Sequence, residues 1–292
     1  MRVLRLAPNV LAFYEGRDDG IRFSEDGNNW VDEGALSLGI ASYAVIDGSQ
    51  ALVYDTHVSV DRGELIRETL EAEGVSEITV LLSHWHLDHV AGTEAFAGCE
   101  VLAGARTDEL LREHRAAIES GGYEGPPAID PLVLPTRVLE GDTELKLGET
   151  PLELLAVNIH SDDATVVWLP EQRLLLAADV VEDTATFVGE PWGFEQHLED
   201  LDRLDALGPA RVLPAHGDPD VIANGGYNRG LIRATQQYIR VLMRMREQPE
   251  LAETPLRELI AGPLDTGWIL YEPGYEAVHA ENVKTVLGQA AG

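Results

Sequence analysis

The chain has 292 residues, 45% of them apolar, which is typical of a globular protein with a substantial core. Its 51 acidic residues outnumber its 21 basic residues, so the formal net charge is −30 at pH 7. A surface with this charge repels nucleic-acid phosphates and anionic membranes, so we expect neither as a partner.

The lysines, the single cysteine and the N-terminal residues narrow the expected class and location of the protein further. Lys146 and Lys284 are the only lysines, which fits either a high-salt habitat or arginine-rich codon usage. Cys99 is the only cysteine, so no intrachain disulfide is expected. Pro8 interrupts the first apolar run, which makes a poor secretion signal, and no stretch approaches the ~20 apolar residues of a membrane span. We therefore expect a cytoplasmic protein.

The first half of the chain is predicted to alternate strands and helices. Short apolar runs bounded by turn residues predict strands at residues 3–14 (one strand or two), 42–46, 51–54, 78–82 and 101–103. Residues 16–29 are charged and glycine-rich and predict a loop. Helical spacing predicts helices at 61–73 and 107–119. Asp61 is the expected N-cap of the first helix, with Leu65, Ile66 and Leu70 on its apolar side.

The second half repeats this pattern after residues 121–135, a Gly- and Pro-rich segment that either connects two halves or lies over a site. Strands are predicted at 143–147, 152–157, 164–169, 174–177 and 211–214, and helices at 195–207, 228–247 and 279–287. Two similar series indicate one domain (1–292) made of two α/β halves, about 1–135 and 136–292. The sheets would pack together with the helices outside.

A cluster of potential metal ligands follows the predicted strand at 78–82. It contains His84, His86, Asp88 and His89 within six residues. Loops at the carboxyl ends of strands are where α/β sheets place ligands. Imidazole nitrogens and carboxylate oxygens suit an ion such as zinc. Solvated loop histidines are the alternative, but the spacing and the preceding strand favour a metal site.

Three further donors follow apolar runs in the second half of the chain. His160 follows the strand at 152–157, Asp179 follows that at 174–177, and His216 follows that at 211–214. Each alone fits an ordinary loop residue equally well. Together with the first cluster they complete two coordination spheres.

The motif His-x-His-x-Asp-His, together with the strand–turn–strand from Ala164 to Asp179, resembles the metallo-β-lactamase superfamily. The resemblance covers about Ser42 to Gly217. It implies a four-layer αβ/βα sandwich, within the α/β (α+β) class, with metals at the sheet edge. Ile159 and Ala215 stand where the family often has glycine, which alters loop geometry without removing a donor.

The resemblance also implies how the donors are shared between two divalent ions. It places one ion on His84, His86 and His160 and the other on Asp88, His89 and His216, with Asp179 bridging them. Zinc is the expected metal, with iron and manganese as alternatives.

The bridging position carries Asp179, where one major class of zinc β-lactamases has cysteine, so β-lactam hydrolysis is not favoured. The lactonase, thioesterase and phosphodiesterase branches fit better, but the last grips its substrate with a basic arm that this chain lacks. We expect a dinuclear zinc hydrolase that cleaves an ester, thioester or lactone, with other amide or carbonyl substrates left open. A hydroxide bridging the two ions would attack the carbonyl. Asp88 would orient it and pass its proton to the leaving group.

Three alternatives remain at this stage. The first is a mononuclear iron dioxygenase acting on thiols or persulfides, against which the complete second donor set argues. The second is a β-lactam hydrolase. The third is a binding or regulatory protein that keeps the fold without turnover.

Candidate substrate contacts come from aromatic residues near the donors, although packing alone explains each of them. They are Trp85, Phe187, Trp192 and Tyr227. His57 is a candidate for orienting a ligand, whereas the histidines at 114, 197 and 279 lie on predicted helices and are expected to be structural or solvated. The expected partner is a small-molecule substrate, and a homodimer is left open.

Overall fold

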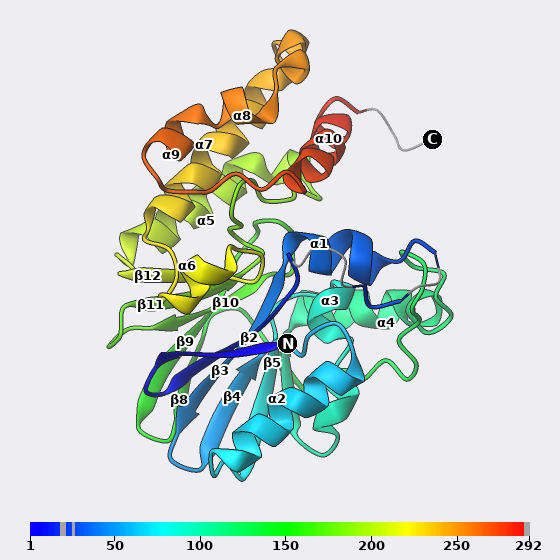
Figure 1. Ribbon diagram of the computed structural model, residues 1–292, viewed down its shortest axis with the longest axis vertical. Helices are drawn as coiled ribbons and strands as arrows, with labels where there is room; N and C mark the ends of the chain where they lie inside the picture. The colour runs from blue at the N-terminus through cyan, green and yellow to red at the C-terminus, as the bar shows by residue number, and fades with distance from the viewer. Residues whose placement is uncertain (18–21, 25–26, 289–292) are drawn as a thin grey trace.

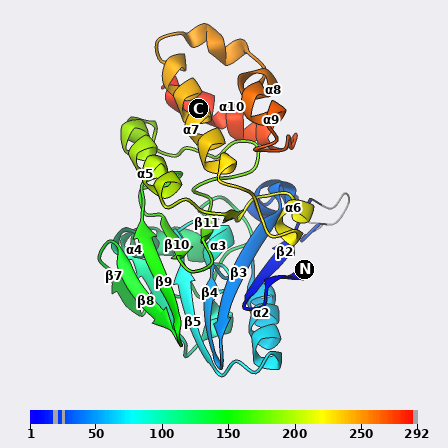
Figure 2. The same ribbon diagram turned by 90° about the vertical axis from the view of Figure 1, so that its left-hand side faces the viewer.

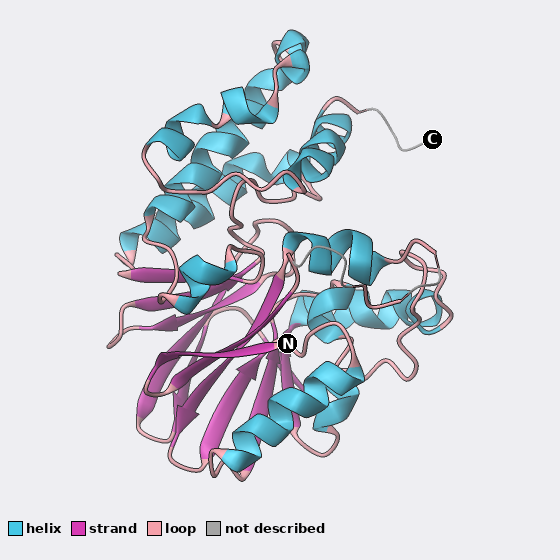
Figure 3. Ribbon diagram, in the orientation of Figure 1, coloured by secondary structure: helices cyan, strands magenta, loops and turns pink. Residues whose placement is uncertain are grey.

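The structure is a computed structural model that describes residues 1–17, 22–24 and 27–288. Residues 18–21 and 25–26 of the predicted 16–29 loop lie outside the described residues. Two β-sheets lie together at the centre, with helices on their outer sides and a further group of helices at one end (Figures 1 and 3). The predicted α/β sandwich is therefore confirmed.

The first sheet has seven strands in sequence order. They are β1 (Arg2–Ala7), β2 (Val10–Glu15), β3 (Ile40–Asp47), β4 (Gln50–Tyr54), β5 (Glu77–Leu82), β6 (Glu100–Gly104) and β7 (Arg137–Leu139). The strands from β1 to β4 pair antiparallel, and those from β4 to β7 pair parallel. The parallel strands direct their carboxyl ends to one edge, where the first donor cluster follows β5.

The second sheet has five strands in the order β12-β11-β10-β9-β8. They are β8 (Thr143–Leu147), β9 (Thr150–Ala156), β10 (Thr165–Leu169), β11 (Leu174–Ala178) and β12 (Arg211–Pro214). Only β11 and β12 pair parallel in this sheet. Their shared direction brings the donors that follow each of them to the same edge.

Helices complete the outer layers. They are α1 (Leu36–Leu38), α2 (Val60–Ala72), α3 (Leu87–Val90), α4 (Ala105–Glu119), α5 (Phe194–Ala206), α6 (Pro219–Ala223), α7 (Gly230–Met245), α8 (Leu256–Leu259), α9 (Ala261–Asp265) and α10 (Tyr275–Val286), with shorter helical turns at Val31–Ala35, Thr93–Phe96, Pro191–Gly193 and Pro249–Glu253. Apolar side chains of α2 and α4 pack on the first sheet, and those of α5 and α7 pack in the core that contains the second sheet. Figure 2 shows α7 to α10 at one end of the sheets.

Several boundaries differ from the sequence-based expectations. Ser59 is the N-cap of α2 in place of Asp61, because its hydroxyl accepts the backbone N–H of Arg62. Leu65 is 44% exposed, so the buried side of α2 is formed by residues 63, 66 and 70. The short strand β7 was not predicted, because it has three residues and forms only by pairing with β6. The helical segment at residues 31–38 was also not predicted, because it consists of two short pieces of five and three residues.

Buried tyrosines join the first sheet to the second half of the chain. Tyr14, Tyr43 and Tyr54 donate hydrogen bonds to the backbone carbonyls of Gly217 (3.1 Å), Pro214 (2.5 Å) and Thr165 (2.7 Å), respectively. Each hydroxyl is satisfied inside an otherwise apolar core, as a buried tyrosine requires. These bonds fix how the two sheets are placed around the site.

Replacing Tyr54 by phenylalanine leaves the carbonyl of Thr165 without its partner in a buried position. We expect the free energy of unfolding to fall by about 1–2 kcal/mol, measured by urea denaturation. Tyr271, whose hydroxyl bonds to Glu276 at the surface, provides the matched control, and its phenylalanine variant should change stability by less than about 0.5 kcal/mol. Equal effects in the two variants would contradict this role.

In the part of the chain that the structure describes, none of the helices has both the length and the apolar character that a membrane crossing requires.

Candidate metal centre

The structure brings all seven predicted donors together at one edge of the two sheets. They form two groups, His84, His86, His160 and Asp179 in the first and Asp88, His89 and His216 in the second, with the ligand atoms of each group within 4.8 Å of one another. The donors come from the loop after β5, from α3, and from the segments that follow β9, β11 and β12. Their assignment as ligands stays a prediction.

Asp179 lies at the centre of the arrangement. Its Oδ2 is surrounded by the Nε2 atoms of four histidines: His89 at 3.2 Å, His216 at 3.3 Å, His160 at 3.6 Å and His84 at 3.7 Å. Two of these histidines belong to each donor group. A single carboxylate therefore faces both groups, as a bridging ligand must.

Hydrogen bonds on the far side of the rings fix which nitrogen faces the centre. His216 Nδ1 lies 2.7 Å from the carbonyl oxygen of Gly39, and His89 Nδ1 lies 2.8 Å from Asp55 Oδ2. Because both partners are acceptors, each Nδ1 carries the proton. In the neutral rings, the lone pair on Nε2 then points at Asp179. Lone pairs facing a carboxylate repel one another unless a positive charge lies between them.

The pKa values indicate that the second donor group favours positive charge. Burial lowers the pKa of an imidazole, but in His89 and His216 the nearby carboxylates of Asp179 and Asp88 outweigh it and raise the pKa well above its usual value. Burial would raise the pKa of Asp88, yet the same two histidines lower it to about 2. For His86, burial dominates and lowers the pKa to about 3.

The donor set fits divalent metal ions. His84 Nε2 and Asp179 Oδ1 are buried polar atoms that have no hydrogen-bond partner. A buried polar atom without a partner costs free energy, which a metal ion at this position would remove. Histidine nitrogens with carboxylate oxygens suit zinc, iron and manganese. His84, His86 and His160 with Asp179 would hold one ion.

Asp55 is a functional residue that the sequence reasoning missed. It is 2% exposed and has a positive φ of 66°, and its two oxygens accept from His89 Nδ1 and from the backbone N–H of Ser83 (2.7 Å). It therefore holds both the ring and the loop of the first cluster. In the sequence, the feature that could have identified Asp55 is a carboxylate directly after β4, at the end of a strand. His57, predicted to orient a ligand, is buried with no partner on either ring nitrogen, so Asp55 does this instead.

A cavity of about 340 Å³ opens onto the donors. Its walls are Trp30, Gly34, Ala35, Leu38, Tyr123, Glu124, Glu182, Phe187 and Val278, together with the metal-facing residues His86, Asp88, His160, Asp179 and His216. The predicted 121–135 segment therefore lies over the site, through Tyr123 and Glu124. The helical segment at 31–38 and α10 supply walls that the sequence did not indicate.

Of the four aromatic residues proposed as substrate contacts, Phe187 lines this cavity. The ring of Trp85 instead stacks on that of His114, with centroids 4.6 Å apart. Trp192 is 76% exposed and lies outside the lining. Tyr227 donates its hydroxyl proton to Asp183 (2.8 Å), also away from the cavity.

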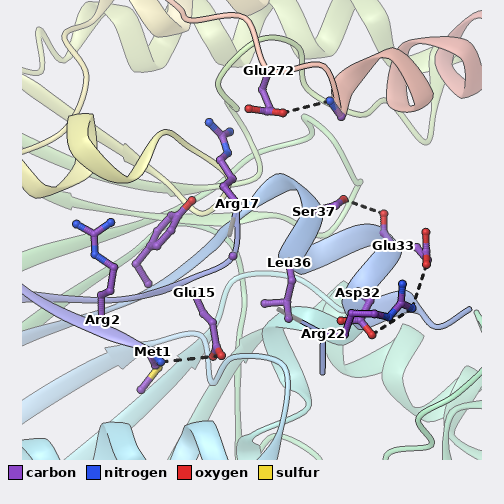
Figure 4. A pocket seen from close by; sticks show the side chains of 13 residues that line it. Met1, Arg2, Glu15, Arg17, Arg22, Asp32, Glu33, Leu36, Ser37 and Glu272 are labelled. Atoms are coloured by element: carbon purple, nitrogen blue, oxygen red, sulfur yellow. Dashed lines mark hydrogen bonds and ion pairs between the residues drawn. The ribbon is translucent and has the colours of Figure 1, made fainter. Parts of the chain in front are cut away.

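A larger cavity of about 590 Å³ lies on the other side of the 31–38 segment (Figure 4). Neither donor group contributes to its lining. Some of its charged residues pair with one another, as Arg22 does with Glu33 (3.2 Å) and the amino group of Met1 with Glu15 (3.9 Å). The smaller cavity is therefore the candidate for substrate binding, because it reaches the donors.

Comparisons with known proteins agree with this geometry. The family model of the metallo-beta-lactamase superfamily matches residues 37–216. A "Beta-lactamase-like protein 2 homolog" from Drosophila melanogaster is 25% identical over 63% of this chain and 61% of its own length. An "Atrochrysone carboxyl ACP thioesterase" from Aspergillus fumigatus is 26% identical over 61% of this chain and 51% of its own length. The chain thus spans less than two thirds of these curated relatives.

Solved structures share the fold. The metallo-beta-lactamase from Pontibacter korlensis superposes with a TM-score of 0.60 at 18% identity, over 82% of this chain and 98% of its own. The DIM-1 metallo-beta-lactamase superposes with a TM-score of 0.60 at 20% identity, over 82% of this chain and 96% of its own. At such low identity the likeness concerns the arrangement of sheets and helices.

Proposed function

Because the chain belongs to the metallo-β-lactamase superfamily and gathers seven metal-type donors at one cavity, we propose that it is a hydrolase of esters, thioesters or lactones that works with two divalent ions, most simply zinc. The observation that carries the proposal is the placement of Asp179 Oδ2 between histidines of both donor groups. An aspartate placed where two ions could share it supports a dinuclear site in preference to a mononuclear iron site.

The chemistry divides between the ions and the protein. Bound divalent ions supply Lewis acidity toward a carbonyl and make water a nucleophile near neutral pH. Asp55 and the carbonyl of Gly39 hold His89 and His216 in the tautomer that presents Nε2. The apolar walls hold the acyl group and exclude bulk water from the carbonyl.

Asp88 is the residue placed to move a proton. It lines the cavity, and its side chain is 16% exposed, with Oδ2 3.2 Å from His216 Nε2. Its low pKa keeps it ionised, and an ionised carboxylate facing the cavity can orient a water and accept its proton when the water is activated by bound metal. The leaving oxygen or sulfur then receives that proton from Asp88.

Relatives whose printed name is thioesterase support acyl substrates, and the apolar residues of the cavity wall agree with them. The test combines metal analysis with a screen of lactone, thioester, β-lactam and phosphodiester substrates. We expect about two zinc ions per chain and turnover of the lactone or thioester group. One iron per chain with oxygen consumption on thiols, or turnover confined to phosphodiesters, would refute the proposal.

A further inference from the structure

Part of the cavity wall lies outside the residues that the superfamily model matches. All seven donors lie between His84 and His216, inside the matched range of residues 37–216. Trp30, Gly34 and Ala35 precede that range, and Val278 of α10 follows it. Four of the nine wall residues outside the donor groups therefore lie beyond the matched range, and the other five, Leu38, Tyr123, Glu124, Glu182 and Phe187, lie within it.

The chain ties these walls together. The indole N–H of Trp30 donates to the carbonyl of Pro127 (2.9 Å), which joins the 31–38 segment to the loop that carries Glu124. On the opposite side, Asn282 of α10 accepts the backbone N–H of Val188 (2.8 Å) and donates to the carbonyl of Thr186 (3.0 Å), on either side of Phe187. The cavity is therefore formed before a substrate enters, and its lining can be used to infer what it admits.

The lining combines apolar surface with negative charge. The apolar part consists of Trp30, Ala35, Leu38, Phe187 and Val278. Two carboxylates outside the donor groups, Glu124 and Glu182, also face the cavity, whereas no lysine or arginine is found among its described lining residues. Positive charge for a ligand is then available from the metal-facing side alone.

The 31–38 segment separates this cavity from the basic residues nearby. Its other side faces the larger cavity, which contains Arg2, Arg17 and Arg22 (Figure 4). These arginines therefore lie on the far side of the 31–38 segment and cannot neutralise an anion bound beside the donors. Away from the metal-facing side, a negatively charged acyl group would meet carboxylates and no compensating basic side chain among the described lining residues.

The two wall carboxylates have different roles. Glu182 is 3% exposed, and its Oε1 accepts from Thr186 Oγ1 (2.9 Å) and from the backbone N–H of Phe187 (3.0 Å), so it is committed to holding the loop. Glu124 is exposed as a residue, but burial of its carboxyl group and the nearby charge of Asp88 raise its pKa to about 7, so it is fully charged only above neutral pH. No basic side chain of the described residues forms an ion pair with it. It is the carboxylate that an incoming substrate meets.

We propose that this cavity accepts esters, thioesters or lactones whose acyl part is apolar and carries no negative charge, and that Glu124 is a specificity-determining residue that excludes anionic acyl groups. This inference rests on the proposed function. Like charges in a partly enclosed site repel one another more strongly than they do in water, and added salt weakens the repulsion at an exposed residue. Discrimination by charge should therefore fall as ionic strength rises.

The test uses the metal-loaded protein at about pH 8.5, above the pKa of Glu124, and two 4-nitrophenyl esters of the same shape that are too long to cyclise, the suberic acid monoester with a free carboxylate and the neutral suberamic acid ester. We expect kcat/KM to be about tenfold lower for the suberic acid monoester. In Glu124→Gln, the ratio of kcat/KM between the neutral and the anionic ester should fall by about threefold, mainly because KM for the anionic ester falls. High salt should lower the same ratio in the wild type. Glu64→Gln, which removes the same charge from an exposed position on α2, should leave the ratio unchanged.

Equal rates for the two esters, or an unchanged ratio in Glu124→Gln, would overturn the inference. Calorimetric binding of the non-cleavable amide analogues of the two compounds separates this result from a failure of the proposed function. If neither ester is hydrolysed but the neutral amide binds more tightly, the hydrolase assignment fails and the selection by charge holds. If the anionic amide binds as tightly as the neutral one, the inference fails whatever the turnover.

Discussion

Replacing Asp179 by alanine should remove both metal ions and lower kcat/KM by at least about a thousandfold. Its Oδ2 is the atom that lies within 3.2–3.7 Å of histidines from both donor groups, and no other donor has this position. Without it, the remaining donor carboxylate, Asp88, lies beside His89 and His216 of the second group, and no carboxylate of the donor groups joins them to the first group. The measurement is the metal content per chain by elemental analysis after dialysis, alongside turnover.

The matched control is Asp220→Ala, because the side chain of Asp220 is 87% exposed and lies outside both donor groups. It should keep full metal content and activity. Circular dichroism of both variants separates loss of metal from loss of fold. Two ions retained in Asp179→Ala would show that the carboxylate does not join the two groups.

Replacing Asp88 by asparagine should give a different pattern, with about one ion retained and kcat/KM lower by about 10²–10⁴-fold. Asparagine keeps the size of the side chain but cannot accept a proton near neutral pH. The first donor group, which does not include Asp88, stays complete. Metal content and turnover measured together therefore distinguish this variant from Asp179→Ala.

A rate near that of the wild type in Asp88→Asn would reject the proton-transfer role. Loss of both ions would show that Asp88 is needed for the first donor group as well. A leaving group with a low pKa needs little protonation, so the defect should be smaller for a 4-nitrophenyl ester than for an alkyl ester. An equal defect for the two esters would indicate a role in metal binding alone.

The donor positions were available from the sequence because each signal is local. A histidine or aspartate directly after an apolar run lies at the carboxyl end of a strand, and such ends meet at one edge of a sheet. The cluster from His84 to His89 and the later donors His160, Asp179 and His216 follow this rule. Strand and helix positions were also largely predicted, since alternation and helical spacing need only neighbouring residues.

Only the tertiary structure decided which residues support and surround the donors. Asp55 reaches His89 across 34 positions of sequence, and Trp30 reaches Pro127 across 97. Proximity in sequence also placed Trp192 and Tyr227 near the site, whereas the structure places one at the surface and the other in a bond to Asp183. Local periodicity determines which face of an element is buried. The cavity walls depend on how distant segments pack, which the side-chain pattern of one segment does not encode.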